Sequence, residues 1–287
     1  MPQITVATDF STRSDRALRR AELLAKITGH DLLFVNVIDD DQPQRLIDVQ
    51  QNEIEDILSE MVETICSVSG IRSTYAVRIG QTFREIPAAA EEADADLVVM
   101  GPHRPKVMRD AFRGSTIERT VRQCSLPIIV ANGVPSAHFK RVMIASDLDH
   151  SSAANIRVVA AMPFLAGAEF LLFHVYESME RAADAMAFSV TEDGSGRLAE
   201  EHTEMQMKAS RFKQEESLPV DKCITRDATG PIAQMVLETA RTEAADLVVV
   251  APRKKGMVEA LMTGHVGTGI LREADRDVLV LPGQELA

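Results

Sequence analysis

The chain has 287 residues, 45% of them apolar and 26% charged, which indicates a soluble globular protein of about two domains. Its formal net charge of −12 disfavours nonspecific binding to nucleic acid, and an aromatic content of 4% without Trp leaves few stacking platforms for single strands. No apolar run approaches the ~20 residues needed to cross a bilayer, and the N-terminus lacks a signal pattern, so we expect a cytoplasmic protein without a membrane partner.

Short apolar runs alternate with helical patterns over the first part of the chain. The patterns predict strands over residues 4–8, 32–38, 72–79, 97–100 and 127–131, and helices over residues 11–29, 43–69, 81–90 and 114–124. The resulting order is βαβαβαβαβ.

The second part of the chain repeats the first. Residues 4–39 align without a gap with residues 142–177, at an offset of 138, and residues 80–131 align with residues 230–281, at an offset of 150. An internal repeat defines the unit that folds, and units of this size are large enough to have their own cores. We therefore expect two domains, a first unit over residues 1–133 and a second unit over residues 139–287.

Each unit is predicted to be a doubly wound α/β domain with a five-stranded parallel sheet. Strands that are apolar throughout and alternate with helices indicate a parallel sheet that is covered on both faces and joined by right-handed crossovers. With the strand order 3-2-1-4-5, the ligand crevice lies between the carboxyl ends of strands 1 and 4. In the first unit these ends are Thr8-Asp9 and Met100-Gly101.

A phosphate-binding pattern follows the fourth strand of the first unit. Gly101-Pro-His-Arg104 is followed by nine residues and then by Gly114-Ser115-Thr116, which opens a helix. Glycine lets the backbone approach a ligand closely, and the free amides of a helix N-terminus suit a phosphate. The unit resembles the ATP-binding branch of the universal stress protein family, whose pattern is Gly-x2-Gly-x9-Gly-(Ser/Thr). The resemblance covers essentially the whole chain as two tandem copies.

The resemblance implies a stress-response regulatory protein that binds ATP, accompanied by Mg²⁺, mainly in its first unit. By position it places Thr8 and Asp9 near the adenosine, with the main chain of Val37 at the adenine. The end of the fourth strand and the start of the helix that follows it would bind the ribose and phosphates. The residues there are Met100, Gly101, Gly114, Ser115 and Thr116. Arg104 stands where the family has a second glycine: it is strained by about 1 kcal/mol if that position needs a positive φ, and otherwise it can contact a phosphate.

The second unit departs further from the pattern. Ala251 replaces Gly101, and His265 replaces the serine that precedes the helix. The loss of the strand-end glycine and of the phosphate hydroxyl weakens the case for ATP in this unit. The weaker second site that the resemblance implies consists of Asp147, Val175, Lys254, Gly264 and His265.

A purely structural interpretation stands beside the binding one. Asp9 and Asp147 each precede a helix, where carboxylates commonly cap the first turn without any ligand. The sequence shows no nucleophile with a base, no metal-ligand cluster and no Walker lysine motif, so we favour binding over catalysis. Two alternatives stay open: a scaffold that acts through an unidentified protein partner without nucleotide, and a slow ATPase.

The last strand of each unit provides an edge for pairing. Members of the family that the chain resembles usually pair through this strand. The resemblance therefore implies that the apolar segments 127–130 and 277–280 meet within one chain, which would make the monomer a pseudo-dimer and cover two edges that are otherwise liable to aggregate. Asp277 stands where the first unit has Pro127, so the two edges are not equivalent. Further homodimerisation is left open.

The three cysteines, Cys66, Cys124 and Cys223, are widely spaced. Their spacing fits neither a disulfide framework nor a zinc site. We expect reduced, buried thiols.

Overall fold

A computed structural model describes residues 2–102, 115–135, 137–178, 194–251 and 265–283. In the first unit the elements follow the predicted alternation. They are β1 (Gln3–Ala7), α1 (Ser14–Thr28), β2 (Asp31–Ile38), α2 (Gln44–Ser69), β3 (Ser73–Ile79), α3 (Thr82–Glu92), β4 (Leu97–Met100), α4 (Thr116–Gln123) and β5 (Ile128–Val130).

The second unit repeats this order, with one short 3-10 helix added. Its elements are β6 (Arg141–Ala145), α5 (His150–Ala160), η1 (Pro163–Leu165), β7 (Glu169–Tyr176), α7 (Gly194–Glu215), β8 (Lys222–Asp227), α8 (Ile232–Thr242), β9 (Leu247–Val250), α10 (His265–Glu273) and β10 (Asp277–Val280). The repeat found in the sequence is thus a repeat of structure.

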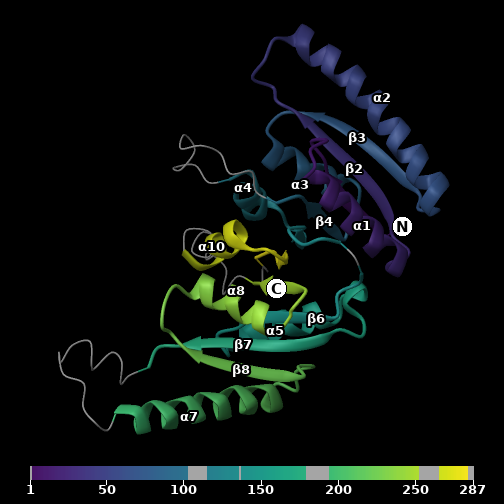
Figure 1. Ribbon diagram of the computed structural model, residues 1–287. Helices are drawn as coiled ribbons and strands as arrows, with labels where there is room; N and C mark the ends of the chain where they lie inside the picture. Colours follow the sequence, from purple (N-terminus) through teal and green to yellow (C-terminus); the bar gives the residue numbers. More distant parts are fainter. Residues whose placement is uncertain (1, 103–114, 136, 179–193, 252–264, 284–287) are drawn as a thin grey trace.

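The described strands join into one continuous sheet that spans both units. Its order is β3-β2-β1-β4-β5-β10-β9-β6-β7-β8, which contains the predicted order 3-2-1-4-5 twice. Within each unit the neighbouring strands are parallel, whereas β5 and β10 pair antiparallel with Ile129 opposite Leu279. The pseudo-dimer predicted within one chain is confirmed, and Figure 1 shows the two units on either side of this junction, near α4 and α10.

Two hydrophobic cores cover the two faces of the sheet. Side chains alternate along each strand, so Val99 and Ile129 face the core that contains α1 and α5, while Val98 and Val130 face the core that contains α3, α4, α8 and α10. Both cores run across the β5–β10 junction without a break. The contact between the units therefore has the character of a domain interior.

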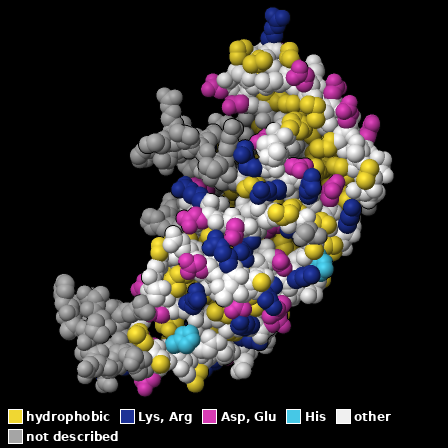
Figure 2. Space-filling view, in the orientation of Figure 1, with side chains coloured by type: hydrophobic (Ala, Val, Ile, Leu, Met, Phe, Trp, Pro, Cys, Tyr) yellow, Lys and Arg dark blue, Asp and Glu magenta, His cyan; other side chains and the backbone are white. Residues whose placement is uncertain are grey.

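The surface differs from the sequence-based expectation at one cysteine. Cys124 is buried and Cys223 is half-buried, but Cys66 is exposed, because it lies on the side of α2 that faces away from the sheet. On the face shown in Figure 2, acidic and basic side chains are interspersed over both units. Within the described residues, no helix combines the length and apolarity required to cross a membrane.

The last two helices of each unit pack through different side chains, large in the first unit (α3 and α4) and small in the second (α8 and α10). In the first unit the guanidinium carbon of Arg119 on α4 lies 3.4 Å from the ring centroid of Phe83 on α3, a cation–π contact. At the equivalent positions of the second unit stand Gly269 on α10 and Ala233 on α8. A Cβ atom placed on Gly269 would lie only 2.7 Å from the Cβ of Ala233. A large pair in one unit thus corresponds to a small pair in the other.

We predict that Gly269→Ala destabilises the protein, although alanine favours helices. The gain in helix propensity is about 1 kcal/mol, whereas overpacking a core costs about 1–3 kcal/mol. Adding Ala233→Gly removes the opposing methyl group and relieves the clash. Urea unfolding of the two single variants and the double variant should show a favourable coupling of about 1 kcal/mol or more, whereas additive effects would show that α8 and α10 separate at no cost.

Candidate functional site

The carboxyl ends of β1 and β4 lie side by side in the first unit, as predicted. Val6 pairs with Val99, so the chain leaves the sheet at Thr8 and at Gly101 along the same edge. The amide of Thr8 still donates to the carbonyl of Val35 on β2, at 2.9 Å. The strand end at the candidate site is therefore still hydrogen-bonded to β2 at Thr8.

Thr8 and Asp9 hold the sharp turn that follows β1. The Thr8 hydroxyl accepts a hydrogen bond from the amide of Phe10 at 3.1 Å, and Asp9 Oδ1 accepts one from the amide of Ser11 at 3.0 Å. Phe10 has a φ of +57°, a left-handed conformation that is costly for a side chain with a Cβ. The two polar side chains offset that strain, so both have a structural role before any ligand is considered.

The carboxylate of Asp9 is exposed and ionised at neutral pH. Desolvation opposes ionisation, but hydrogen bonds from Ser11 and Ser14 and the charge of Arg13 outweigh it, so the pKa of Asp9 lies below its ordinary value. Asp9 caps no helix, because the N-cap residue of α1 is Arg13, which makes no side-chain capping bond. The capping interpretation is wrong at this position.

Gly101 is required by the protein itself. A Cβ atom at this position would lie 2.6 Å from the carbonyl oxygen of Arg13 and 3.0 Å from the amide nitrogen of Ser14, at the start of α1. These are backbone atoms, which cannot move aside as the end of a flexible side chain can. The close approach that the sequence suggested for a ligand is made here by the N-terminus of α1.

Val37 lies near the carboxyl end of β2, opposite Arg78 of β3. The neighbouring Asn36 is buried, and its side-chain amide donates to the carbonyl of Thr8 at 2.9 Å. In the second unit the equivalent His174 contacts the carbonyl of Ser146 through Nδ1 at 2.8 Å. Asn36 was not among the predicted site residues, although a polar side chain in an otherwise apolar strand was a signal for it.

The start of α4 supplies the other side of the predicted site. Ser115 is the N-cap residue, and its hydroxyl accepts from the amide of Glu118 at 3.2 Å, while Thr116 is exposed. Glu118 itself is buried in the first turn and forms an ion pair with Arg272 of α10 at 2.8 Å. This carboxylate, which the sequence analysis missed, offsets part of the positive charge of the helix N-terminus. Gly114 and Arg104 lie outside the described residues.

The second unit builds the same turn with different residues. The hydroxyl of Ser146 accepts from the amide of Leu148 at 3.1 Å, and Leu148 has a φ of +58°. Asp149 caps α5 by accepting from the amide of Ser152 at 2.7 Å, so the capping interpretation of Asp147 is also wrong. Asp147 instead donates its amide to the hydroxyl of Ser152, at 3.3 Å.

The remaining positions of the weaker site are only partly described. Val175 lies opposite Arg226 in the pairing of β7 with β8. His265 is the first residue of α10. Lys254 and Gly264 lie outside the described residues, as does the side chain of His265. Among the described residues, no group of three or more His, Cys, Asp or Glu side chains could hold a metal ion.

We predict that Gly101→Ala lowers the stability of the protein without any ligand present. The new methyl group would overlap the backbone at Arg13, and such overpacking costs about 1–3 kcal/mol. The matched control is Ala251→Gly at the equivalent position of the second unit, which should change stability by less than ~1 kcal/mol. Urea unfolding measures both. An unchanged stability of Gly101→Ala would mean that glycine is needed there for another reason.

Comparison with known proteins adds the family to this geometry. Residues 1–132 and residues 138–282 each match the model of the universal stress protein family. The chain is 30% identical over 127 residues to universal stress protein G of Escherichia coli O157:H7, which covers 41% of this chain and 87% of that protein. It is 20% identical over 155 residues to a universal stress protein of Methanocaldococcus jannaschii, which covers 45% of this chain and 93% of that protein.

Solved structures share the two-unit arrangement. The crystal structure of a universal stress protein from Archaeoglobus fulgidus superposes with a TM-score of 0.70 over 99% of this chain and 97% of its own, at 18% identity. A protein of unknown function from Pseudomonas aeruginosa superposes with a TM-score of 0.64 over 99% of this chain and 93% of its own, at 17% identity. These likenesses concern the fold, whereas the two family matches concern nearly the whole sequence. The chain is therefore a tandem member of the universal stress protein family.

Proposed function

We propose that this protein is a nucleotide-responsive regulator of the stress response that binds one ATP at the carboxyl edge of β1 and β4 in its first unit. The observation that carries the proposal is the arrangement of that edge. Thr8 and Asp9 form a rigid turn beside Gly101, and the ionised, exposed carboxylate of Asp9 is available to accept hydrogen bonds from ribose hydroxyls.

The start of α4 would hold the phosphates. Its first amides are oriented along the helix axis, Thr116 is exposed, and the hydroxyl of Ser115 retains its proton for donation while it accepts from the amide of Glu118. The buried Glu118 carboxylate opposes this attraction, so a cation beside the phosphates would strengthen binding. We propose Mg²⁺ and Arg104 as the sources of that charge. The residues proposed to contact nucleotide are Thr8, Asp9, Val37, Met100, Gly101, Arg104, Gly114, Ser115 and Thr116.

The second unit is proposed as the structural partner of the first. Its turn at Ser146 and Leu148 copies that of the first unit, but Ala251 replaces the strand-end glycine and His265 replaces the N-cap serine. A regulator needs a ligand-dependent state and a target, so we propose that an as yet unidentified protein partner reads the nucleotide state. We propose binding without turnover, because among the described residues of this edge only Asp9 could polarise a water molecule.

A second candidate function rests on a specific observation. Gly101 is explained by its contact with Arg13, and the hydroxyl of Ser115 is used as a helix cap, so two motif residues have structural roles of their own. The edge would then be a relic of the family fold. In that case the protein is a scaffold that acts through protein contacts alone.

Calorimetric titration of the whole chain with ATP and Mg²⁺ separates these functions. We expect about one site per chain, and we expect Asp9→Ala to weaken binding by about tenfold or more, because a charged hydrogen-bond acceptor for the ribose is lost. The matched control is Asp147→Ala in the second unit, which should bind as the unchanged protein does. A melting curve of each variant checks that the turn is intact.

Three outcomes would contradict the proposal. The absence of heat up to millimolar ATP would leave the scaffold function. Two sites per chain, or equal losses in Asp9→Ala and Asp147→Ala, would show that the units are equivalent. By contrast, copurified adenine nucleotide, which absorbs at 260 nm in a chain without Trp, would support the proposal and argue against the scaffold.

A further inference from the structure

A buried ion pair links the two units beside the β5–β10 junction. Arg20, on α1 of the first unit, places its Nε atom 2.6 Å from Oδ2 of Asp277, the first residue of β10. The two side chains are only 6% and 1% exposed. The contact is therefore a buried ion pair that joins α1 to the start of β10.

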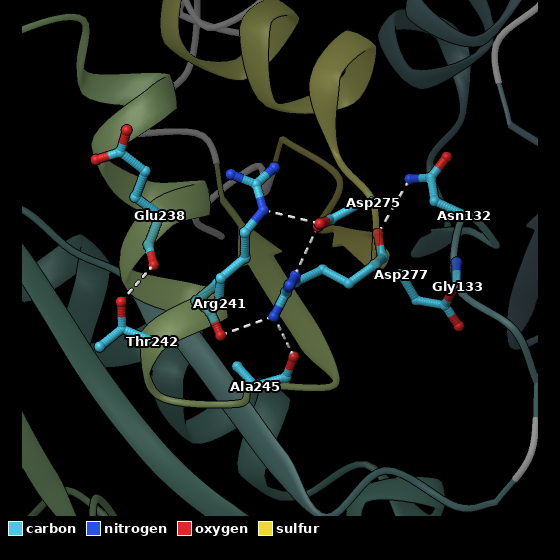
Figure 3. A network of polar contacts seen from close by, with 10 residues as sticks. Asn132, Gly133, Glu238, Arg241, Thr242, Ala245, Asp275 and Asp277 are labelled. Carbon is cyan, nitrogen blue, oxygen red and sulfur yellow. Dashed lines mark hydrogen bonds and ion pairs between the residues drawn. The ribbon is translucent and has the colours of Figure 1, made fainter.

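The groups around Arg20 come from the second unit and from the segment that leads into it. The guanidinium donates through NH1 to the carbonyl of Ala137 at 2.8 Å, and its central carbon lies 4.4 Å from the ring centroid of Phe139, which is buried. The other oxygen of Asp277 accepts from the amide of Gly133 at 2.8 Å. Figure 3 shows Gly133 beside Asp277, next to the network of Asp275 and Arg241.

The pseudo-symmetry of the chain provides a second copy of this corner, and it carries no charge. The repeat places Val158 of α5 at the position of Arg20, and Pro127 at the position of Asp277. Val158 is 38% exposed. In an ordinary symmetric dimer every contact occurs twice, since residue i meets j and j meets i. Here the two corners of the junction differ: one is charged and buried, and the other is apolar and more open.

Because the two corners differ, the residue that lies opposite Arg20 or Asp277 depends on which two units pair. When the first unit pairs with the second, Arg20 meets Asp277. If two first units paired, Arg20 of each would lie opposite Pro127 and would lose the carboxylate of Asp277. If two second units paired, each Asp277 would lie opposite Val158. Removing one partner from a buried ion pair is strongly destabilising, because an uncompensated charge stays buried.

Among the described residues, a second ion pair across the junction does not discriminate against two first units. Glu118 of α4 meets Arg272 of α10, and the residue equivalent to Arg272 in the first unit is Arg122. A pairing of two first units would therefore still offer an arginine to each Glu118. Discrimination against a pair of first units therefore depends on Arg20 and Asp277, whereas a pair of second units would also set Arg272 opposite Thr268, the residue equivalent to Glu118.

We propose that the Arg20–Asp277 pair is a specificity determinant, which makes the sheet edge of the first unit accept the edge of a second unit and reject a second copy of itself. Buried ion pairs add little net stability, because removing both charges from water costs about as much as their attraction returns. Burial accordingly raises the pKa of Asp277 above its ordinary value, and the attraction of Arg20 and the hydrogen bond from Gly133 offset only part of that rise. Its effect is to penalise the wrong partner.

The proposal is tested by cutting the linker of the folded, full-length protein. A protease site is inserted after Val134, which is exposed, and the purified chain is cleaved. Ala137 and Phe139 then stay with the second unit. The cleaved units are incubated until their distribution no longer changes, and native mass spectrometry at micromolar concentration then weighs the complexes. The mixed pair of a first and a second unit and the two like pairs of identical units differ in mass. For the unchanged protein we expect the mixed pair to exceed the like pairs by about tenfold or more.

Two variants remove the discrimination and one keeps it. In Arg20→Val/Asp277→Val both corners are apolar, and the mixed pair should fall toward about half of all complexes, the fraction for random pairing. Asp277→Asn keeps the shape and an acceptor for the amide of Gly133 but removes the charge, and it should also raise the share of like pairs. The matched control is Asp275→Asn, two residues away, whose exposed carboxylate pairs with Arg241 and Arg276 inside the second unit. It should keep the original distribution.

The result that would overturn the proposal is equally direct. The proposal is rejected if Arg20→Val/Asp277→Val folds and still gives the same fraction of mixed pairs as the unchanged protein. That result would show that the ion pair does not select the partner edge. If that variant does not fold before cleavage, Asp277→Asn decides, and an unchanged distribution rejects the proposal. Like pairs as abundant as mixed pairs in the unchanged protein would reject it as well.

Discussion

The antiparallel pairing of β5 with β10 is the constraint on which the rest of the molecule depends. Each unit alone would leave a short apolar strand at its edge, and such edges invite association with other chains. Pairing them inside one chain turns two five-stranded sheets into one and lets both cores continue across the junction. The helices that open at the two motif positions, α4 and α10, are brought together by the same pairing and joined through Glu118 and Arg272.

The candidate site shows how one set of residues can serve the fold and a ligand together. A left-handed Phe10 is held by Thr8 and Asp9, and Gly101 makes room for the start of α1. Each of these features stabilises the fold, and each also leaves backbone and carboxylate groups along one edge of the sheet. The glycine and the hydroxyl of this motif therefore have structural roles of their own, beside the roles proposed for them in nucleotide binding.

Periodicity and the internal repeat predicted the element order and the two parallel sheets, because these follow from apolar patterns that alternate along the chain. The strand order follows from the doubly wound fold class, and the pairing of the units was implied by the resemblance to the family. The reasons behind single residues were not predictable in this way. The contact of Gly101 with Arg13, the bond from Asn36 to Thr8 and the burial of Glu118 depend on which elements meet in space. Cys66 was wrongly expected to be buried, since the helical pattern of α2 did not distinguish its outward side at that position.

The exchange of Phe83 and Arg119 for Ala233 and Gly269 has a consequence for how the two units can change. A recombination event that combined α3 with α10 would set Phe83 against Gly269. One that combined α8 with α4 would set Ala233 against Arg119, which would then lack an aromatic ring for its cation–π contact. One combination leaves a groove and the other a stranded cation, so hybrids would fold less well than either parent. The side chains of α3 and α4 therefore fit each other, as do those of α8 and α10. Although the two units share one fold, a helix of one unit cannot replace its equivalent in the other without loss of packing.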